Sequence, residues 1–145
     1  MELNTNYINK IGTIYPINPD NEQPMYYINY DKAPLKYQIN LYFSLIAIEI
    51  NRNYILHLNI KSSDGLTKVD TDLNVNGKEL LEENRINEAG LTSGTFTVKS
   101  SIFRVNEGVN FYNVNLVLRD AETGIIYDSS DTHFVTRQDP DVINN

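Results

Sequence analysis

The sequence predicts an all-β protein, an antiparallel β-sandwich of about eight strands. In the stretch from Asn106 to Tyr127, residues Tyr112, Val114, Leu116 and Leu118 alternate with side chains of the opposite parity, as in a strand with one buried face. Short apolar segments of this kind recur along the chain with turn residues between them, which is typical of a sandwich. At 145 residues the chain is long enough to bury a core without cysteine, which it lacks.

In the first third of the chain, residues 3–17 predict an opening strand or a pair of short strands. The segment from Pro16 to Pro34 contains four prolines and predicts a surface connection that holds a short edge strand. Residues 37–50 are almost continuously apolar, and their apolar parity changes after Leu45. They predict a strand that is buried on both faces or carries a bulge, with a helix as the alternative.

The remaining elements follow from alternation and turn signals. Residues 54–60 predict a strand, and Asp64-Gly65 predicts the hairpin turn to a strand over residues 66–75. The run from Lys78 to Gly90 predicts one short helix in a connection, because it has a small apolar face and a glycine stop. A long bent strand over 94–105, the hairpin of Asn106–Tyr127 and a last strand over 132–137 complete a single domain, 1–138. Residues 139–145 are expected to form a flexible tail.

The corner before the hairpin refines this architecture. Glu107-Gly108-Val109, followed by Tyr112 and the inward Val114, resembles the tyrosine corner of immunoglobulin-like and fibronectin-type sandwiches. The resemblance implies an immunoglobulin-like sandwich in which the Tyr112 hydroxyl bonds back to that corner. It implies nothing about activity, because one fold carries many functions.

Charge and hydropathy exclude several classes of partner. The net charge is −7 and no stripe of lysine and arginine occurs, so nucleic acid is not expected to bind. The chain has no apolar run long enough for a membrane span and no signal peptide, so we expect no membrane partner and a cytoplasmic location. Frequent Asn and Ile with scarce Ala favour AT-rich coding, as in low-GC bacteria and their phages, and a phage-encoded protein would be associated with the virion.

Residues that could carry chemistry are few, and we expect no catalytic residue, no cofactor and no metal. His57 and His133 are the only side chains that ordinarily titrate near neutral pH, and both are more simply surface residues of strands. Alternate acids could bind calcium, but they lack the spacing of an EF-hand, and ordinary solvated loops explain them better. They occur as three pairs, Asp70 with Asp72, Asp120 with Glu122, and Asp139 with Asp141.

Tyrosine is the feature that points to a function. Seven of the ten tyrosines lie in the first 42 residues, and Tyr26, Tyr27, Tyr30 and Tyr37 are the best candidates for contacts with a partner. The sequence therefore predicts a non-catalytic binding or assembly module with a protein partner, which could be a second copy of the chain. A carbohydrate-binding sandwich is the alternative, since tyrosine rings stack on sugars, and a hydrolase is a distant third.

Overall fold

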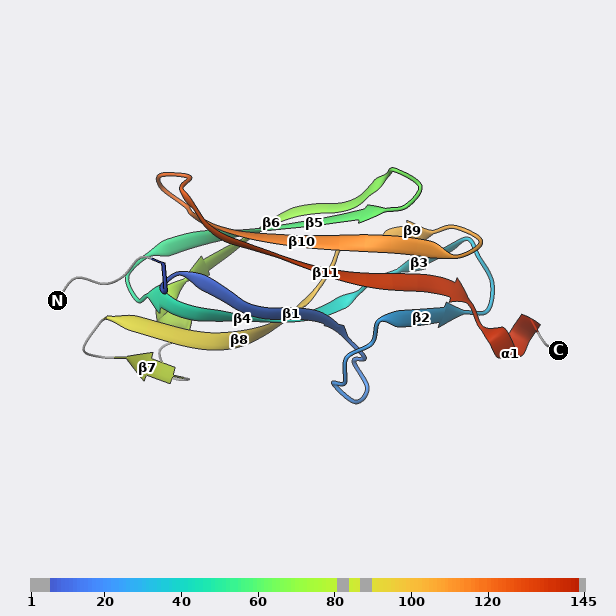
Figure 1. Cartoon of the computed structure of the whole chain (residues 1–145), viewed down its shortest axis with the longest axis horizontal. Helices are drawn as coiled ribbons and strands as arrows, with labels where there is room; N and C mark the ends of the chain where they lie inside the picture. Colours follow the sequence, from blue (N-terminus) through green and yellow to red (C-terminus); the bar gives the residue numbers. More distant parts are fainter. Residues whose placement is uncertain (1–5, 81–83, 87–89, 144–145) are drawn as a thin grey trace.

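Two β-sheets lie face to face as two layers (Figure 1). The computed structural model describes residues 6–80, 84–86 and 90–143. The four-stranded sheet has the order β1-β4-β8-β7, with β1 at Lys10–Ile17, β4 at Asn40–Glu49, β8 at Leu91–Lys99 and β7 at Asn84–Ile86. The five-stranded sheet has the order β2-β11-β10-β5-β6, with β2 at Tyr27–Tyr30, β11 at Ile126–Gln138, β10 at Asn110–Asp120, β5 at Asn53–Ser62 and β6 at Thr67–Asn76. The all-β sandwich expected from the sequence is confirmed.

A small third sheet lies at the end of the sandwich where the β5–β6 turn is found (Figure 1). It consists of β3, Leu35–Tyr37, paired antiparallel with β9, Phe103–Val105. Two short helical turns complete the described chain, the 3-10 helix η1 at Gly77–Leu80 and α1 at Pro140–Ile143. Strand pairing is antiparallel except between β2 and β11, which run parallel at one edge of the five-stranded sheet.

The core lies between the inner faces of the two sheets, and β10 is its centre. Tyr112, Val114, Leu116 and Leu118 are at most 2% exposed, as their alternation predicts. β10 pairs with β11 on one side and with β5 on the other, so its inward side chains have neighbouring strands on both sides. The Tyr112 ring stacks on Phe134 of β11 with the ring centroids 4.4 Å apart.

The bulge predicted in the long apolar strand is present in β4. The pairing of β4 with β8 shifts between Leu45 and Ile48, and Ala47 has a φ of 55°. The extra residue exchanges the buried parity, since Phe43, Leu45 and Ile48 are buried while Ile46 is exposed. The Asn9 amide donates to the Ala47 carbonyl, and the Ala47 amide donates to Ser93 Oγ. These bonds satisfy the backbone at the bulge.

Several expected elements differ from the structure. The described chain has eleven strands rather than about eight. The helix expected over 78–90 is wrong where it is described: 77–80 form a 3-10 turn and 84–86 form β7, while 81–83 and 87–89 lie outside the described residues. Pairing of β7 with β8 outweighs the modest helix propensity of this segment. The expected tail contains the helical turn α1.

Two further predictions combined or divided strands wrongly. The long bent strand over 94–105 is two strands, β8 and β9, which belong to different sheets. The hairpin partner and the last strand are instead one continuous strand, β11, which pairs with β10 along its length. The β10–β11 register shifts once, between Leu118 and Arg119.

The expected tyrosine corner is built by a different residue. The Tyr112 hydroxyl lies 3.2 Å from Thr136 Oγ1 on β11 and does not bond back to residues 107–109. The hydroxyl that does reach this corner belongs to Tyr30, which donates to the Gly108 carbonyl at 2.8 Å. Tyr30 is therefore a core residue that ties β2 to the loop before β10.

Candidate interaction surface

The outer face of the five-stranded sheet is the candidate site, and its residues follow from strand parity. On β10 the inward positions are even-numbered, so Phe111, Asn113, Asn115, Val117 and Arg119 point outward. The strand register carries each of these positions across the neighbouring strands as a row of outward side chains. The rows differ in chemistry: one end of the face is apolar, and the middle is polar.

The apolar end is a row of three side chains, Phe111 on β10, Val135 on β11 and Tyr27 on β2, called here the apolar row. The register pairs Phe111 with Val135 and Val135 with Tyr27, so the three lie side by side across three strands. Phe111 is 60% exposed and Tyr27 is 58% exposed. The two outer positions are two strand spacings apart, roughly 9.6 Å.

One cation borders the apolar row. The Arg137 guanidinium carbon lies 4.9 Å from the centroid of the Tyr27 ring, within the range of a cation–π contact. Arg137 Nε also donates to Asn29 Oδ1 at 2.9 Å. These two contacts fix the guanidinium plane and the Tyr27 ring relative to each other, so this corner of the surface is ordered before any partner arrives.

A histidine lies between two carboxylates in the polar middle of the face. His57 Nε2 is 2.8 Å from Asp70 Oδ1, and His57 Nδ1 is 2.7 Å from Asp72 Oδ1. Arg119 contacts the other oxygen of Asp72 at 3.3 Å. The hydrogen bond from His57 and the positive charge of Arg119 hold the pKa of the Asp72 carboxyl below its ordinary value. His57 and this acid pair are more than ten residues apart in the sequence, and the β5–β6 register brings them together.

The next row is neutral or acidic. The Asn115 amide donates to Ser129 Oγ and to Asp131 Oδ1, each at 3.1 Å. His133, the second histidine of interest, is exposed on β11 beside Asn113. The two histidines are thus on different strands with β10 between them. None of the described residues form a group of three or more His, Cys, Asp or Glu side chains placed to hold a metal ion.

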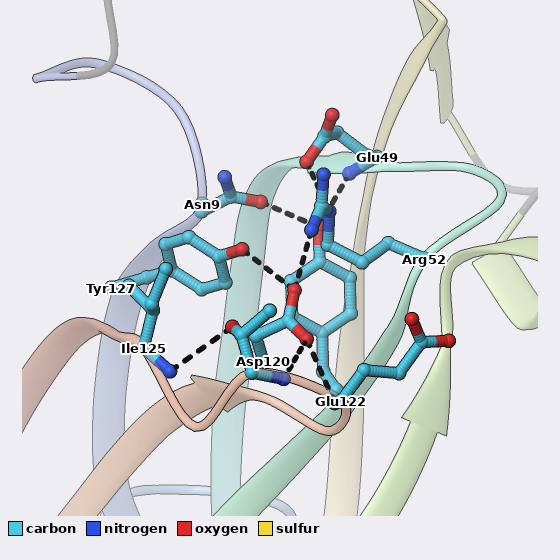
Figure 2. Close-up of polar contacts among 9 residues, drawn as sticks. Asn9, Glu49, Arg52, Asp120, Glu122, Ile125 and Tyr127 are labelled. Carbon is cyan, nitrogen blue, oxygen red and sulfur yellow. Dashed lines mark hydrogen bonds and ion pairs between the residues drawn. The ribbon is translucent and has the colours of Figure 1, made fainter.

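A second polar cluster lies at the opposite end of the sandwich, around Asp120 (Figure 2). The Asp120 side chain is only 2% exposed. One of its oxygens accepts from the amides of Glu122 and Thr123, and the other accepts from Arg52 and from the Tyr127 hydroxyl. These hydrogen bonds, with the amide of Thr123 the strongest influence and Arg52 next, hold the pKa of Asp120 well below its ordinary value.

This cluster stabilises the fold, because its charged and polar groups bond one another rather than face a ligand. Arg52 also pairs with Glu49 at 2.5 Å, so its charge is already balanced by two acids. Tyr54 donates to the buried Asn9 Oδ1 and accepts from the Glu49 amide. A polar hollow of about 350 Å³ adjoins the cluster, lined by Glu49, Arg52, Asn53, Glu122 and neighbouring residues. The expected pair Asp120 and Glu122 is therefore a turn, in which the Asp120 side chain accepts from the Glu122 backbone amide.

Of the four tyrosines expected to contact a partner, two are exposed, one is buried and one is half-buried. Tyr26 is 47% exposed and Tyr27 is 58% exposed. Tyr30 is only 7% exposed and is bonded to Gly108. Tyr37 packs against the core with its ring edge on Phe103, and its burial raises the pKa of its hydroxyl. Contact with a partner remains a prediction, and only Tyr26 and Tyr27 are placed to make it through their rings.

Sequence reasoning did not select Phe111, Val135 or Arg137 as site residues. One signal was available, since Phe111 occupies an outward position of the best-defined strand, where the following outward residues are asparagines. The alignment of Phe111 with Tyr27 depends on the β2–β11 pairing of segments more than 100 residues apart, which no local pattern announces.

Comparisons with known proteins find no matching family model and no significantly similar curated protein. Solved structures share the fold. A Bacteroides uniformis β-glucuronidase matches with a TM-score of 0.53 and 11% identity over 83% of this chain. Bacteroides uniformis β-glucuronidase 2 covalently bound to cyclophellitol-6-carboxylate aziridine matches with a TM-score of 0.54 and 12% identity. The chain spans 12% of the length of each of those chains, and the likeness shows a common β-sandwich fold alone.

Proposed function

We propose that this chain is a non-catalytic β-sandwich module that binds a protein partner through the apolar row. The observation that carries the proposal is the alignment of Phe111, Val135 and Tyr27 across three strands, with both terminal rings more than half exposed. Burying large apolar side chains of this kind is favourable at about 25 cal/mol for each Å² removed from water. The row is therefore the part of this face that gains most from being covered.

The surroundings of the row suit a protein interface. Tyrosine and arginine are enriched among residues that dominate binding energy, and Tyr27 is stacked under Arg137. Asn113 and His133 lie in the next outward row and provide a polar rim. The whole surface is carried on paired strands, so little conformational freedom is lost when a partner binds.

The non-catalytic part of the proposal draws on the state of His57. Both of its ring nitrogens lie within 2.8 Å of a carboxylate oxygen, so a substrate would have to displace Asp70 or Asp72 to reach either nitrogen. The hollows at Glu49–Arg52 and at Pro34–Arg104 are lined by neither histidine. An enzyme using His57 as a general base would first have to move one of these two carboxylates away from the ring.

Affinity capture with matched variants tests the proposal. The tagged protein is used to retain partners from its native host, in parallel with Phe111→Ala/Tyr27→Ala and a control that truncates two exposed apolar residues elsewhere, Tyr7→Ala/Ile125→Ala. A protein retained by the parent and the control but reduced at least about tenfold by the first variant supports the proposal. Equal retention by all three proteins contradicts it.

The self-association form of the proposal has its own measurement. Sedimentation velocity over a concentration series is expected to show a dimer of the parent that Phe111→Ala/Tyr27→Ala dissociates, if the partner is a second copy. A single monomeric species at high concentration removes that version and leaves a different protein as the partner.

Carbohydrate binding is the second candidate. It is favoured by the same two rings, which offer apolar faces beside hydrogen-bonding side chains at Asn113, His133 and Arg137. The solved structures of similar fold are named β-glucuronidases, and this name is compatible with carbohydrate binding. A glycan array followed by calorimetry tests it. Binding that depends on Tyr27 supports it, and a blank array removes it.

A further inference from the structure

The small β3–β9 sheet carries two cations at directly opposed positions. The register pairs Lys36 of β3 with Arg104 of β9, and both side chains are exposed on one face of this sheet. Their opposite face carries Tyr37 and Phe103, which pack in the core with their rings in edge contact. The two charges are therefore held side by side on a ribbon that the core fixes in place.

No carboxylate among the described residues neutralises this pair. Ion pairs within 4.0 Å in the described part of the chain involve Arg52, His57, Lys68 and Arg119. Neither Lys36 nor Arg104 forms one with a described residue. Like charges directly opposite on neighbouring strands are unfavourable, and a chain of net charge −7 has many acids that could have been placed there. The pair therefore leaves an unneutralised positive spot on an acidic protein.

An apolar hollow adjoins the two cations. It has a volume of about 300 Å³ and is lined by Pro34, Leu35, Lys36 and Arg104. Leu35 packs against the core on one side and borders the hollow on the other, so it is a fixed wall. An occupant that satisfies the whole site must offer negative charge to the cations and an apolar group to Pro34 and Leu35.

We propose that this hollow, called here the Lys36–Arg104 site, binds an acidic segment of a protein, in which a carboxylate residue lies next to a large apolar one. A carboxylate gains charge-assisted hydrogen bonds from both cations, and the neighbouring apolar side chain enters the hollow. A polyanion such as nucleic acid fits poorly, because the acidic remainder of the protein repels its other charges. The site is separate from the apolar row, and its test does not depend on that row.

Fluorescence anisotropy with three capped, dye-labelled peptides tests the site on the full chain. The first peptide has one aspartate next to a leucine, the second has one aspartate next to a serine, and the third has one lysine next to a leucine, each in an otherwise uncharged sequence. The first is expected to bind most tightly and to weaken as salt is raised. The second loses the hollow and the third loses the cations, so each is expected to bind at least about tenfold more weakly.

Matched variants locate the binding. Lys36→Gln/Arg104→Gln is expected to weaken binding of the first peptide at least about tenfold, whereas Lys61→Gln/Lys78→Gln removes the same charge at exposed positions elsewhere and is expected to leave it within about twofold. Phe111→Ala/Tyr27→Ala is expected to leave this binding unchanged, which separates the site from the apolar row. The proposal would be overturned if Lys36→Gln/Arg104→Gln and Lys61→Gln/Lys78→Gln weakened binding of the first peptide equally. It would also be overturned if the first peptide did not bind at millimolar concentration. A rise in anisotropy that occurs only at protein concentrations where the protein self-associates would overturn it as well.

Discussion

Leu116 shows what a single inward residue of β10 contributes. It is 1% exposed, between β11 and β5. Leu116→Ala is expected to lower the free energy of unfolding by about 2–5 kcal/mol, because it removes buried methyl groups and leaves a cavity in a centre that two strands hold open. Urea denaturation followed by far-UV circular dichroism measures the change.

The neighbouring residue provides the control. Val117 points outward on the same strand, so Val117→Ala keeps the backbone and loses only surface packing. Its expected cost is within about 1 kcal/mol. Equal losses for Leu116→Ala and Val117→Ala would contradict the assignment of the inward face.

Asp120 makes stability depend on pH at the acidic end. Its pKa is lowered in the folded protein by the amides of Thr123 and Glu122 and by Arg52, so the unfolded chain binds its proton more readily than the folded one. The carboxylate therefore stabilises the fold at pH values above its ordinary pKa of about 3.9, and this contribution is lost as the pH falls toward the lower folded value. We expect the parent to lose stability more steeply than Asp120→Asn below about pH 4.5.

Urea midpoints at several pH values from neutral to about 2.5 check this expectation. The difference between the parent and Asp120→Asn should be largest at neutral pH and shrink with acid. Asp131→Asn is the control, since the bonds to that exposed carboxylate within the described part of the chain come from the amides of Asn113 and Asn115, and its curve should parallel the parent curve. A constant difference between the parent and Asp120→Asn at every pH would contradict the linkage.

At the scale of single residues, sequence reasoning succeeded where one strand decides the outcome. The inward faces of Tyr112 to Leu118 follow from period-2 alternation alone. The tyrosines were harder to predict, because distant segments cover them: the Gly108 corner contacts the buried Tyr30, and β9 packs on the half-buried Tyr37. Their burial depends on pairing that a linear pattern does not contain.

At the scale of elements, Gly77 controls the exit from β6. A Cβ at this position would overlap the Glu49 carbonyl oxygen and lie 2.8 Å from the Ile50 Cα, both backbone atoms of the β4–β5 turn. The Gly77 amide also donates to the Arg52 carbonyl. Gly77→Ala is expected to cost about 1–3 kcal/mol, because the two segments must separate to admit the methyl group.

Thermal unfolding of Gly77→Ala and of Lys78→Ala measures this contact. Lys78 is the next residue and its side chain is exposed, so its truncation tests the local effect of an alanine without the close approach. We expect a clear drop in midpoint for the first variant and almost none for the second. Equal midpoints for the two variants would contradict the prediction, because they would mean that the chain after β6 accommodates the methyl group without loss of stability.

Elements with local partners were the predictable ones. The β5–β6 hairpin has its Asp64-Gly65 turn as expected, and Gly65 has the positive φ of 84° that such a turn requires. The segment over 94–105 is predicted as one long bent strand, because apolar residues resume at 102–105 after the polar Lys99-Ser100-Ser101. Its division between two sheets follows from β8 pairing with β4 and β9 pairing with β3, both over long sequence separations.

The candidate surface follows the same rule. The polar parity of β5 and β10 is visible in the sequence, so the outward positions of His57, Asn113 and Asn115 were predictable. The rows that join Phe111 to Tyr27, and His57 to Asp70 and Asp72, depend on strand order and register. Composition can suggest that tyrosines bind, but only the register shows which ones lie beside one another.

At the scale of the whole molecule, specific contacts join the two sheets. Asp128 of β11 accepts from the Ile11 amide of β1 at 2.8 Å, which closes one side of the sandwich. At the Asp120 end, Asn9 before β1 bonds Tyr54 of β5, and Arg52 joins Glu49 of β4 to Asp120 of β10. Stability therefore rests on one shared core and these links.

In the described part of the chain, no helix is long and apolar enough to cross a membrane.

Because the two sheets and the β3–β9 sheet share one core, the sandwich is expected to unfold as one unit. Near-UV circular dichroism follows tyrosine packing such as the Tyr112–Phe134 stack, and far-UV circular dichroism follows the strands. Their urea transitions should coincide with a single m-value of about 1–3 kcal/mol/M.

Asn9→Gly keeps the positive φ of 57° at that residue and removes the acceptor for Tyr54. Asn9→Gly should lower the free energy of unfolding by about 1–3 kcal/mol, and by the same amount whether it is measured in the near-UV or the far-UV. A shift of the near-UV transition alone would show that the sheets separate before the strands unfold, and the two layers would then be independent units.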